Sequence, residues 1–202
     1  MDQVSLFFAF YSLILGLAIT EVLGGFGRFV RSHATHKLGA QTALLAIFTF
    51  VSITASWIDS FQTLRSIQLD VESLWAPILT ATCYYLAATV VFPTSATDLD
   101  HLDDYFAERK RFAIGFLFAC EMLVTYTFKD IIYEGAVQHP ETFLYFFLPF
   151  HIILKGSYIA LFFSKSKRAN IFWLSILILL LMFVYWDHGT IAQMIDKAYA
   201  RS

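Results

Sequence analysis

Six long apolar runs constrain this chain more than any other feature of its sequence. The clearest extends from Ile171 to Trp186 without a charged residue. A helix needs about 17–25 mainly apolar residues to cross the hydrocarbon core of a bilayer. The runs predict an all-α fold, a polytopic membrane bundle of six transmembrane helices with short loops, in a single transmembrane domain over residues 1–202. The predicted spans are about 4–28, 40–62, 74–93, 112–131, 142–163 and 170–187.

Composition points the same way. Of the 202 residues, 58% are hydrophobic and 15% are charged, whereas soluble domains carry about 25% charged residues. These values exclude disordered chains, collagen and disulfide scaffolds. With a formal net charge of −2, no nucleic-acid partner is expected. Cys83 and Cys120 lie in apolar runs and are expected to be buried free thiols.

Lysine and arginine positions predict the orientation, because cytoplasmic loops carry an excess of these residues. Nine fall in the loops after the first, third and fifth spans, and four fall on the opposite side. Both termini are therefore expected outside, with the three basic loops in the cytoplasm. The nine are Arg28, Arg31, Lys37, Arg109, Lys110, Arg111, Lys165, Lys167 and Arg168.

The loop between the third and fourth spans has a helical pattern. Leu99, Leu102 and Phe106 recur at helical spacing. We expect an amphipathic helix over 97–108 on the cytoplasmic surface, leading into the fourth span. Such a helix offers a docking surface for a partner protein.

Four ionisable residues fall well inside the predicted spans: Glu21, Glu121, His151 and Lys155. Such residues are costly in a bilayer and tend to face the bundle interior or a water-filled path. At a rise of about 1.5 Å per residue, Glu121 and Lys155 lie at the same depth, roughly 14–15 Å from the cytoplasmic end. His151 and Lys155 share a helix face, because they are four residues apart. These four are candidates for a pathway or ligand pocket. The alternative is a buried ion pair that only fixes helix register.

Small residues recur every four positions along the first two spans. Ridges of this kind let membrane helices approach closely. A second interpretation is that their hydroxyl groups line a hydrophilic path, which makes Thr20, Ser56 and Asp59 secondary polar candidates. The ridges are Ser12, Gly16, Thr20 and Gly24 in the first span, and Ser52, Ser56 and Ser60 in the second.

Catalytic motifs are absent from the sequence, which has no P-loop, G-x-G-x-x-G or G-x-S-x-G. We therefore expect no enzymatic activity and no cofactor. His33 and His36 with residues 98–104 offer an alternative, a cytoplasmic metal site, but no closed ligand spacing supports it and no metal is expected. A retinal Schiff base at Lys155 is disfavoured, because such proteins typically have seven spans with the lysine in the last.

Three stretches carry a resemblance to a known group of proteins. They are Tyr11-Ser-Leu-Ile-Leu-Gly-Leu-Ala-Ile-Thr-Glu21 running to Arg28, Tyr85-Leu-Ala-Ala88 running to Phe92-Pro93, and Tyr105-Phe106 before Arg109-Lys-Arg111-Phe112. Over most of the first, third and fourth spans, the chain resembles a group of bacterial six-span membrane proteins with no assigned activity. The resemblance implies a bacterial inner (plasma) membrane and implies no particular chemistry.

Two functions from different classes fit these observations. The first is a small transporter or channel for protons, ions or a small solute, acting through a polar site near the midplane. The second is a non-catalytic membrane scaffold, sensor or effector subunit that docks a cytoplasmic partner. In both cases the expected partners are the lipid bilayer and either further copies of the chain or other subunits of a membrane complex.

Overall fold

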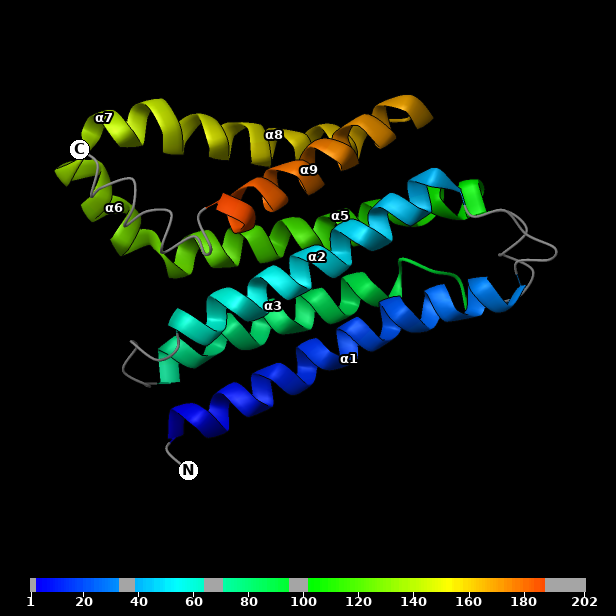
Figure 1. Cartoon of the computed structure of the whole chain (residues 1–202), viewed down its shortest axis with the longest axis horizontal. Coiled ribbons are helices and arrows are strands. Elements are labelled where there is room, and N and C mark those ends of the chain that lie inside the picture. Colours follow the sequence, from blue (N-terminus) through cyan, green and yellow to red (C-terminus); the bar gives the residue numbers. More distant parts are fainter. Residues whose placement is uncertain (1–2, 33–38, 64–70, 95–101, 188–202) are drawn as a thin grey trace.

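The computed structural model describes residues 3–32, 39–63, 71–94 and 102–187. Within these ranges the chain is helical and has no strand, so the predicted all-α fold is confirmed there (Figure 1). The elements are α1 (Gln3–Ser32), α2 (Ala40–Thr63), α3 (Val71–Thr89), α5 (Leu102–Thr127), α6 (Lys129–Gln138), α7 (Pro140–Thr142), the π-helical turn η1 (Phe143–Phe147), α8 (Leu148–Phe163) and α9 (Lys167–Asp187).

In the described part of the chain, the six long helices form a closed ring. The order around it is α1, α3, α5, α8, α9 and α2, and α2 returns to α1. α2 also contacts α3 and α5 across the ring. Figure 1 shows α1, α3 and α5 in successive rows, with α8 and α9 on the far side from α1. Residues far apart in sequence therefore face one shared interior.

Four segments are long and apolar enough to cross a membrane: Ser5–Arg31, Ala40–Phe61, Phe143–Phe163 and Lys167–Tyr185. Leu102–Thr127 with Ile132–Gln138 makes a fifth if this pair, bent by 58°, counts as one span. The predicted count of six is not confirmed by these described segments. α3 is not among them, because its 19 residues include Glu72, Pro77 and several hydroxyl side chains that lower its mean hydropathy. It packs between α1 and α5.

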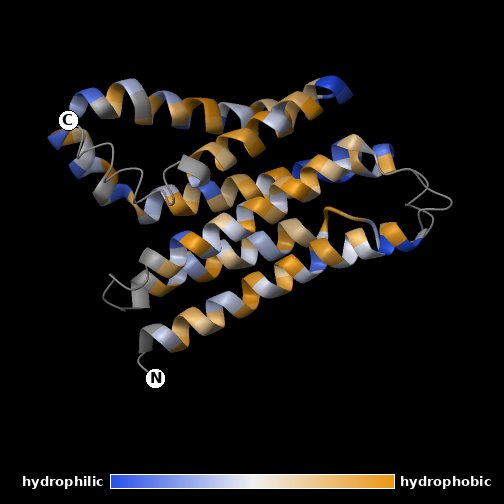
Figure 2. Ribbon diagram, in the orientation of Figure 1, coloured by the Kyte–Doolittle hydropathy of each residue, from blue (hydrophilic) through white to orange (hydrophobic). Residues whose placement is uncertain are grey.

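Apolar side chains cover the outer faces of the helices. Leu13 is 61% exposed, Leu179 is 65% exposed and Phe172 is 56% exposed. Figure 2 shows apolar residues along the length of the long helices. Soluble monomers rarely expose large apolar patches, whereas lipid accommodates them. The helices are thus compatible with an integral membrane protein.

The start of α5 differs from the separate amphipathic helix expected over 97–108. Residues 102–108 are the first turns of α5 itself, and residues 97–101 lie outside the described ranges. Leu102 and Phe106 are 4% and 3% exposed. Their apolar face is therefore buried against the bundle of the same chain.

Hydroxyl groups on the helices bond back to their own backbone. Thr49 Oγ1 donates to Leu45 O at 2.8 Å, and Ser157 Oγ donates to Ile153 O at 2.7 Å. An unsatisfied polar group costs several kcal/mol in hydrocarbon. These local bonds let polar residues occupy apolar helices without a partner on another helix.

The tightest approach at any glycine in the described ranges is at Gly25, next to the predicted ridge residue Gly24. A Cβ atom at Gly25 would lie 2.1 Å from Phe92 Cδ2 and 2.8 Å from Phe92 Cβ. At Gly16, a Cβ atom would meet nothing within 4 Å. At Gly25 the absence of a side chain therefore allows direct packing against Phe92, in the segment that follows α3.

Candidate functional site

A cavity of about 90 Å³ lies inside the helix ring. Within the described ranges, each of the six long helices contributes at least one polar side chain to its wall. We call it the central cavity. The polar lining residues are Tyr11, Ser52, Ser56, Asp59, Ser60, Thr80, Tyr84, Glu121, Thr127, Tyr158 and Tyr185. The apolar ones are Ala55, Pro77, Val124, Phe128, Leu154 and Leu181.

The central cavity extends from the middle of the bundle towards one end. Ser52 lies halfway along α2, and Ser60 lies in its last turn. Thr127 is the last residue of α5, and Tyr185 lies in the last turn of α9. The cavity therefore points to the end at which α2, α5 and α9 finish.

Four side chains from α5 and α8 form a polar cluster at the cavity wall: Glu121, Thr125, His151 and Lys155. Glu121 Oε1 lies 3.6 Å from His151 Nδ1 and 3.7 Å from Lys155 Nζ. Lys155 Nζ donates to Thr125 Oγ1 at 3.3 Å. The Glu121 side chain is 17% exposed. We call this group the Glu121 cluster.

His151 lies close to both charged partners in this cluster. Its Nδ1 lies 3.2 Å from Lys155 Nζ as well as 3.6 Å from Glu121 Oε1. An ammonium group can only donate, so Nδ1 accepts from Lys155 in the tautomer that carries the imidazole proton on Nε2. A protonated Nδ1 would instead donate towards Glu121. The partner that His151 Nδ1 bonds therefore depends on which ring nitrogen carries the proton.

A π-helical turn precedes His151 and places it. Pro149 has no backbone N–H, so the carbonyl four residues earlier loses its usual helical donor. The structure has η1 directly before α8. The Phe147 ring at the end of this turn packs on the His151 imidazole, with centroids 4.3 Å apart. Single π-helical turns are frequently found at functional sites.

A second, smaller cavity of about 50 Å³ adjoins the first. Glu121 and Tyr185 line both volumes, and His151 and Thr125 line only the smaller one. Glu121 therefore stands between the central cavity and the side of the bundle that holds His151.

Asp59 is the second carboxylate of the central cavity. It accepts a hydrogen bond from the Tyr185 hydroxyl, which joins α2 to α9. Nearby, the hydroxyls of Tyr11 and Ser56 are hydrogen-bonded at 2.9 Å. Ser52 Oγ is buried and has no hydrogen-bond partner in the described part of the chain.

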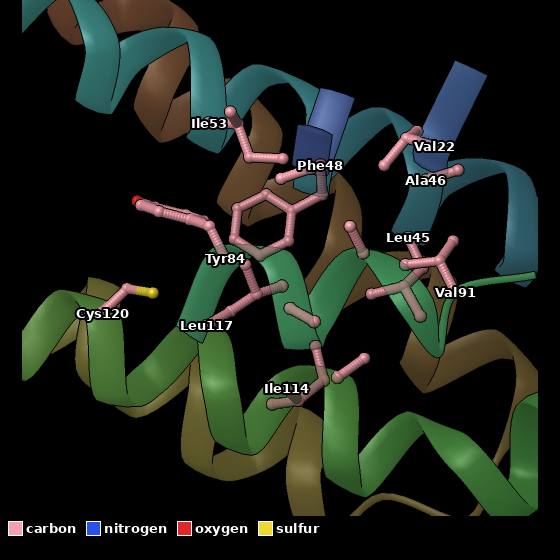
Figure 3. Packing of buried hydrophobic residues seen from close by; sticks show 14 of the residues in the cluster. Val22, Leu45, Ala46, Phe48, Ile53, Tyr84, Val91, Ile114, Leu117 and Cys120 are labelled. Atoms are coloured by element: carbon pink, nitrogen blue, oxygen red, sulfur yellow. The ribbon is translucent and has the colours of Figure 1, made fainter. Parts of the chain in front are cut away.

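An apolar layer closes the other end of the central cavity. On α2, Leu45 and Phe48 precede Ser52, and on α5, Ile114 and Leu117 precede Glu121. Figure 3 shows these side chains of α2 and α5 meeting around Phe48, beside Tyr84. The apolar layer is Leu45, Phe48, Ile114, Leu117, Leu161, Leu174 and Leu177, each at most 2% exposed.

The structure brings together most of the residues selected from the sequence. Asp59, Ser56 and Glu121 line the central cavity, and His151 and Lys155 adjoin Glu121. Glu21 and Thr20 do not reach it. Glu21 is half-buried on α1 outside the lining, and Thr20 is exposed and donates to its own backbone at Gly16 O, 2.8 Å away.

Sequence reasoning missed the tyrosines. Tyr11, Tyr84, Tyr158 and Tyr185 line the cavity from four different helices. The available signal was that a buried tyrosine hydroxyl usually finds a hydrogen-bond partner. Sequence periodicity alone did not show that these four rings share one interior.

Neither cysteines nor histidines assemble a metal centre in the described ranges. No group of three His, Cys, Asp or Glu side chains is arranged to hold a metal there. His33, His36 and residues 98–101 lie outside the described ranges. Cys120 is buried, with its thiol donating to Thr80 O at 3.4 Å, and Cys83 is half-buried; both are free thiols.

Comparison with known proteins adds no assignment. No protein-family model, curated protein or solved structure matches the chain.

Proposed function

We propose that the protein is a small membrane transporter or channel that passes protons or a small cation through the central cavity. The observation that carries this proposal is that two carboxylates from separate helices, Asp59 and Glu121, line the same cavity. Carboxylate and hydroxyl oxygens suit protons and hard cations. Ionisable residues inside membrane bundles tend to mark ion or proton pathways.

The size of the cavity limits what it can hold. A volume of about 90 Å³ accommodates a few water molecules, a small ion or a solute of a few heavy atoms. Lipids and nucleotides are much too large for it. The proposed cargo is therefore a proton or a small cation.

The apolar layer gives the proposed pathway a closed end. The Gln41-to-Ser52 separation of eleven residues on α2 corresponds to roughly 16 Å of rise. Lys110 and Glu121 on α5 are separated by the same number of residues. On each helix, these two polar residues flank buried residues of the apolar layer. Transport through the bundle requires this layer to part or to hydrate.

Within the Glu121 cluster, we propose that Glu121 is the group that gains and loses the transported ion or proton. Lys155 and His151 hold its carboxylate in place at 3.7 Å and 3.6 Å. A proton arriving at Glu121 neutralises its charge and weakens both contacts. Such a change in charge can loosen the α5–α8 contact and couple occupancy to movement.

The location belongs to the same proposal. From the resemblance described above we propose a bacterial inner membrane, and from the lysine and arginine positions we propose that both termini lie outside. We propose that it works as a homo-oligomer or as a subunit of a membrane complex.

Ion flux in proteoliposomes tests the proposal. Purified protein is reconstituted with an internal pH dye or a cation-sensitive dye, and H⁺, Na⁺ and K⁺ gradients are imposed in turn. We expect one of these gradients to dissipate faster than in empty vesicles, and Asp59→Asn to slow that dissipation. Folded, inserted protein that passes none of the three ions would refute the proposal.

The alternative function, a scaffold that docks a partner through residues 97–108, receives less support. In this segment the apolar side chains of Leu102 and Phe106 are buried in the bundle and are not presented to a partner.

A further inference from the structure

A separate polar pocket of about 530 Å³ lies at the end of the bundle where α5 and α9 begin and α8 ends. The apolar layer separates it from the central cavity. Four cationic side chains line it, against two acidic ones. The cations are Lys110, Arg111, Lys165 and Lys167, and the acids are Asp103 and Glu108. We call it the basic pocket.

Lys110 is the most informative of these residues. It is only 5% exposed, although lysine is almost never fully buried without a partner. Its ammonium group donates to Asn170 Oδ1 at 2.9 Å, to Leu161 O at 3.2 Å and to Ser164 O. All three acceptors are neutral. In the described ranges no carboxylate pairs with Lys110, so its charge is solvated by dipoles but not neutralised.

The acidic residue nearest to this network is already engaged. Asp103 Oδ2 pairs with Lys167 Nζ at 2.5 Å, and Asp103 Oδ1 accepts from Gln41 Nε2 at 3.1 Å. Gln41 Oε1 in turn accepts from Asn170 Nδ2 at 2.7 Å. These hydrogen bonds connect four residues that line the basic pocket: Asp103, Gln41, Asn170 and Lys110. Asp103 is thereby directed at Lys167 and Gln41, while Arg111 and Lys165 stand exposed at the rim.

Helix geometry adds to the positive potential. α9 has 21 residues and begins at Lys167, so the positive end of its dipole lies beside the pocket. Helix N-termini favour anions, and basic pockets between membrane helices suit phosphate head groups. From the lysine and arginine positions, we expect this end to lie at the cytoplasmic surface, at the level of the lipid head groups.

We propose that the basic pocket binds a phosphate-bearing anion, with Arg111 and Lys165 contacting the phosphate oxygens and Lys110 attracting it from the buried side. The phosphate can belong to an anionic lipid head group or to free phosphate. Arginine is suited to paired hydrogen bonds with phosphate oxygens, and lysine acts as a point charge. This binding does not depend on ion passage through the central cavity.

Thermal unfolding of the full chain in detergent tests the proposal. Inorganic phosphate and short-chain phosphatidylglycerol are titrated separately, with sodium chloride of equal ionic strength and short-chain phosphatidylcholine as references. We expect a rise in Tm with at least one of the two probes beyond both references. A rise with inorganic phosphate shows that the group itself is bound, and a rise with phosphatidylglycerol alone shows that it is held as a lipid. No rise with either probe overturns the proposal.

A matched pair of double variants locates the binding. Arg111→Gln with Lys165→Gln removes two cations of the pocket rim. Arg109→Gln with Arg168→Gln removes two exposed cations, one on α5 and one on α9, that do not line it. We expect the first pair to weaken binding of the active probe about tenfold or more, since charge-assisted hydrogen bonds are lost. Equal weakening by both pairs would mean non-specific attraction and would overturn the assignment.

Discussion

Glu121 on α5, which lines the central cavity, faces Lys155 on α8, with Oε1 3.7 Å from Nζ. Both side chains are largely shielded, at 17% and 27% exposure. His151 and Thr125 contact the same ammonium group. A charge pair in this setting joins two helices and also brings an ionisable group to a cavity, and the two roles can be separated by mutation.

Removing one member of this pair is expected to lower the free energy of unfolding more than removing both. Glu121→Gln leaves the Lys155 charge without its carboxylate. We expect a loss of about 1–3 kcal/mol in unfolding free energy, below the roughly 3–5 kcal/mol for a fully buried pair. Adding Lys155→Met should recover part of that loss, as measured by detergent unfolding. Strictly additive losses in the double variant would show that the two side chains do not interact.

Tyr185 is expected to position Asp59. Tyr185→Phe removes the hydroxyl that donates to the Asp59 carboxylate. Hydrogen bonds to charged groups contribute about 1.5–3 kcal/mol, so we expect a lower Tm and slower ion flux. Tyr133→Phe is the matched control, because Tyr133 is 71% exposed and lies outside the cavity. Equal flux in the two variants would show that the Tyr185 hydroxyl has no role in the pathway.

Gly25 and Gly16 are expected to respond oppositely to alanine. Gly25→Ala forces the Phe92 side chain to move, since Phe92 atoms lie 2.1–2.8 Å from the new Cβ. Overpacking of this kind costs about 1–3 kcal/mol. Gly16→Ala meets open space and should leave Tm unchanged or slightly higher. Thermal unfolding of the two variants side by side would contradict this packing if Gly16→Ala proved the more damaging.

The apolar layer is expected to restrain ion passage. Phe48→Ala opens space in the layer, and Leu117→Ala is a second variant if the first does not fold. We expect ion leak through proteoliposomes to rise severalfold over the unmodified protein. The control is Phe172→Ala, at a ring that is 56% exposed. An unchanged leak in folded Phe48→Ala or Leu117→Ala protein would argue against a path through the ring.

Helix positions were largely predictable from the sequence, because apolar runs of this length form helices. The predicted 40–62 and 142–163 closely match Ala40–Thr63 and the continuous run from Phe143 to Phe163. The predicted span 112–131 falls within a longer helical stretch that is bent. The helix starts ten residues earlier, where Leu102 and Phe106 pack on the bundle, and it bends by 58° after Thr127. Tertiary packing accounts for the earlier start.

The candidate site was predictable only where depth and helix face were both fixed. Helix rise placed Glu121 and Lys155 at one level, and four-residue spacing placed His151 beside Lys155. The same depth estimate said nothing about which way α1 turns Glu21. Rotation of a helix depends on its neighbours in the ring, and the ring order is not encoded in hydropathy. Burial of Lys110 was missed for the same reason, since its partners come from α8 and α9.

The most direct test compares two glutamates in the same assay. Glu121→Gln and Glu21→Gln make the same chemical change, but only Glu121 lines the central cavity. Initial rates of ion flux are measured in proteoliposomes that contain equal amounts of folded protein. We predict that Glu121→Gln abolishes the flux and that Glu21→Gln retains the rate of the unmodified protein. Flux that survives Glu121→Gln, or that both substitutions reduce equally, would contradict a pathway through the Glu121 cluster.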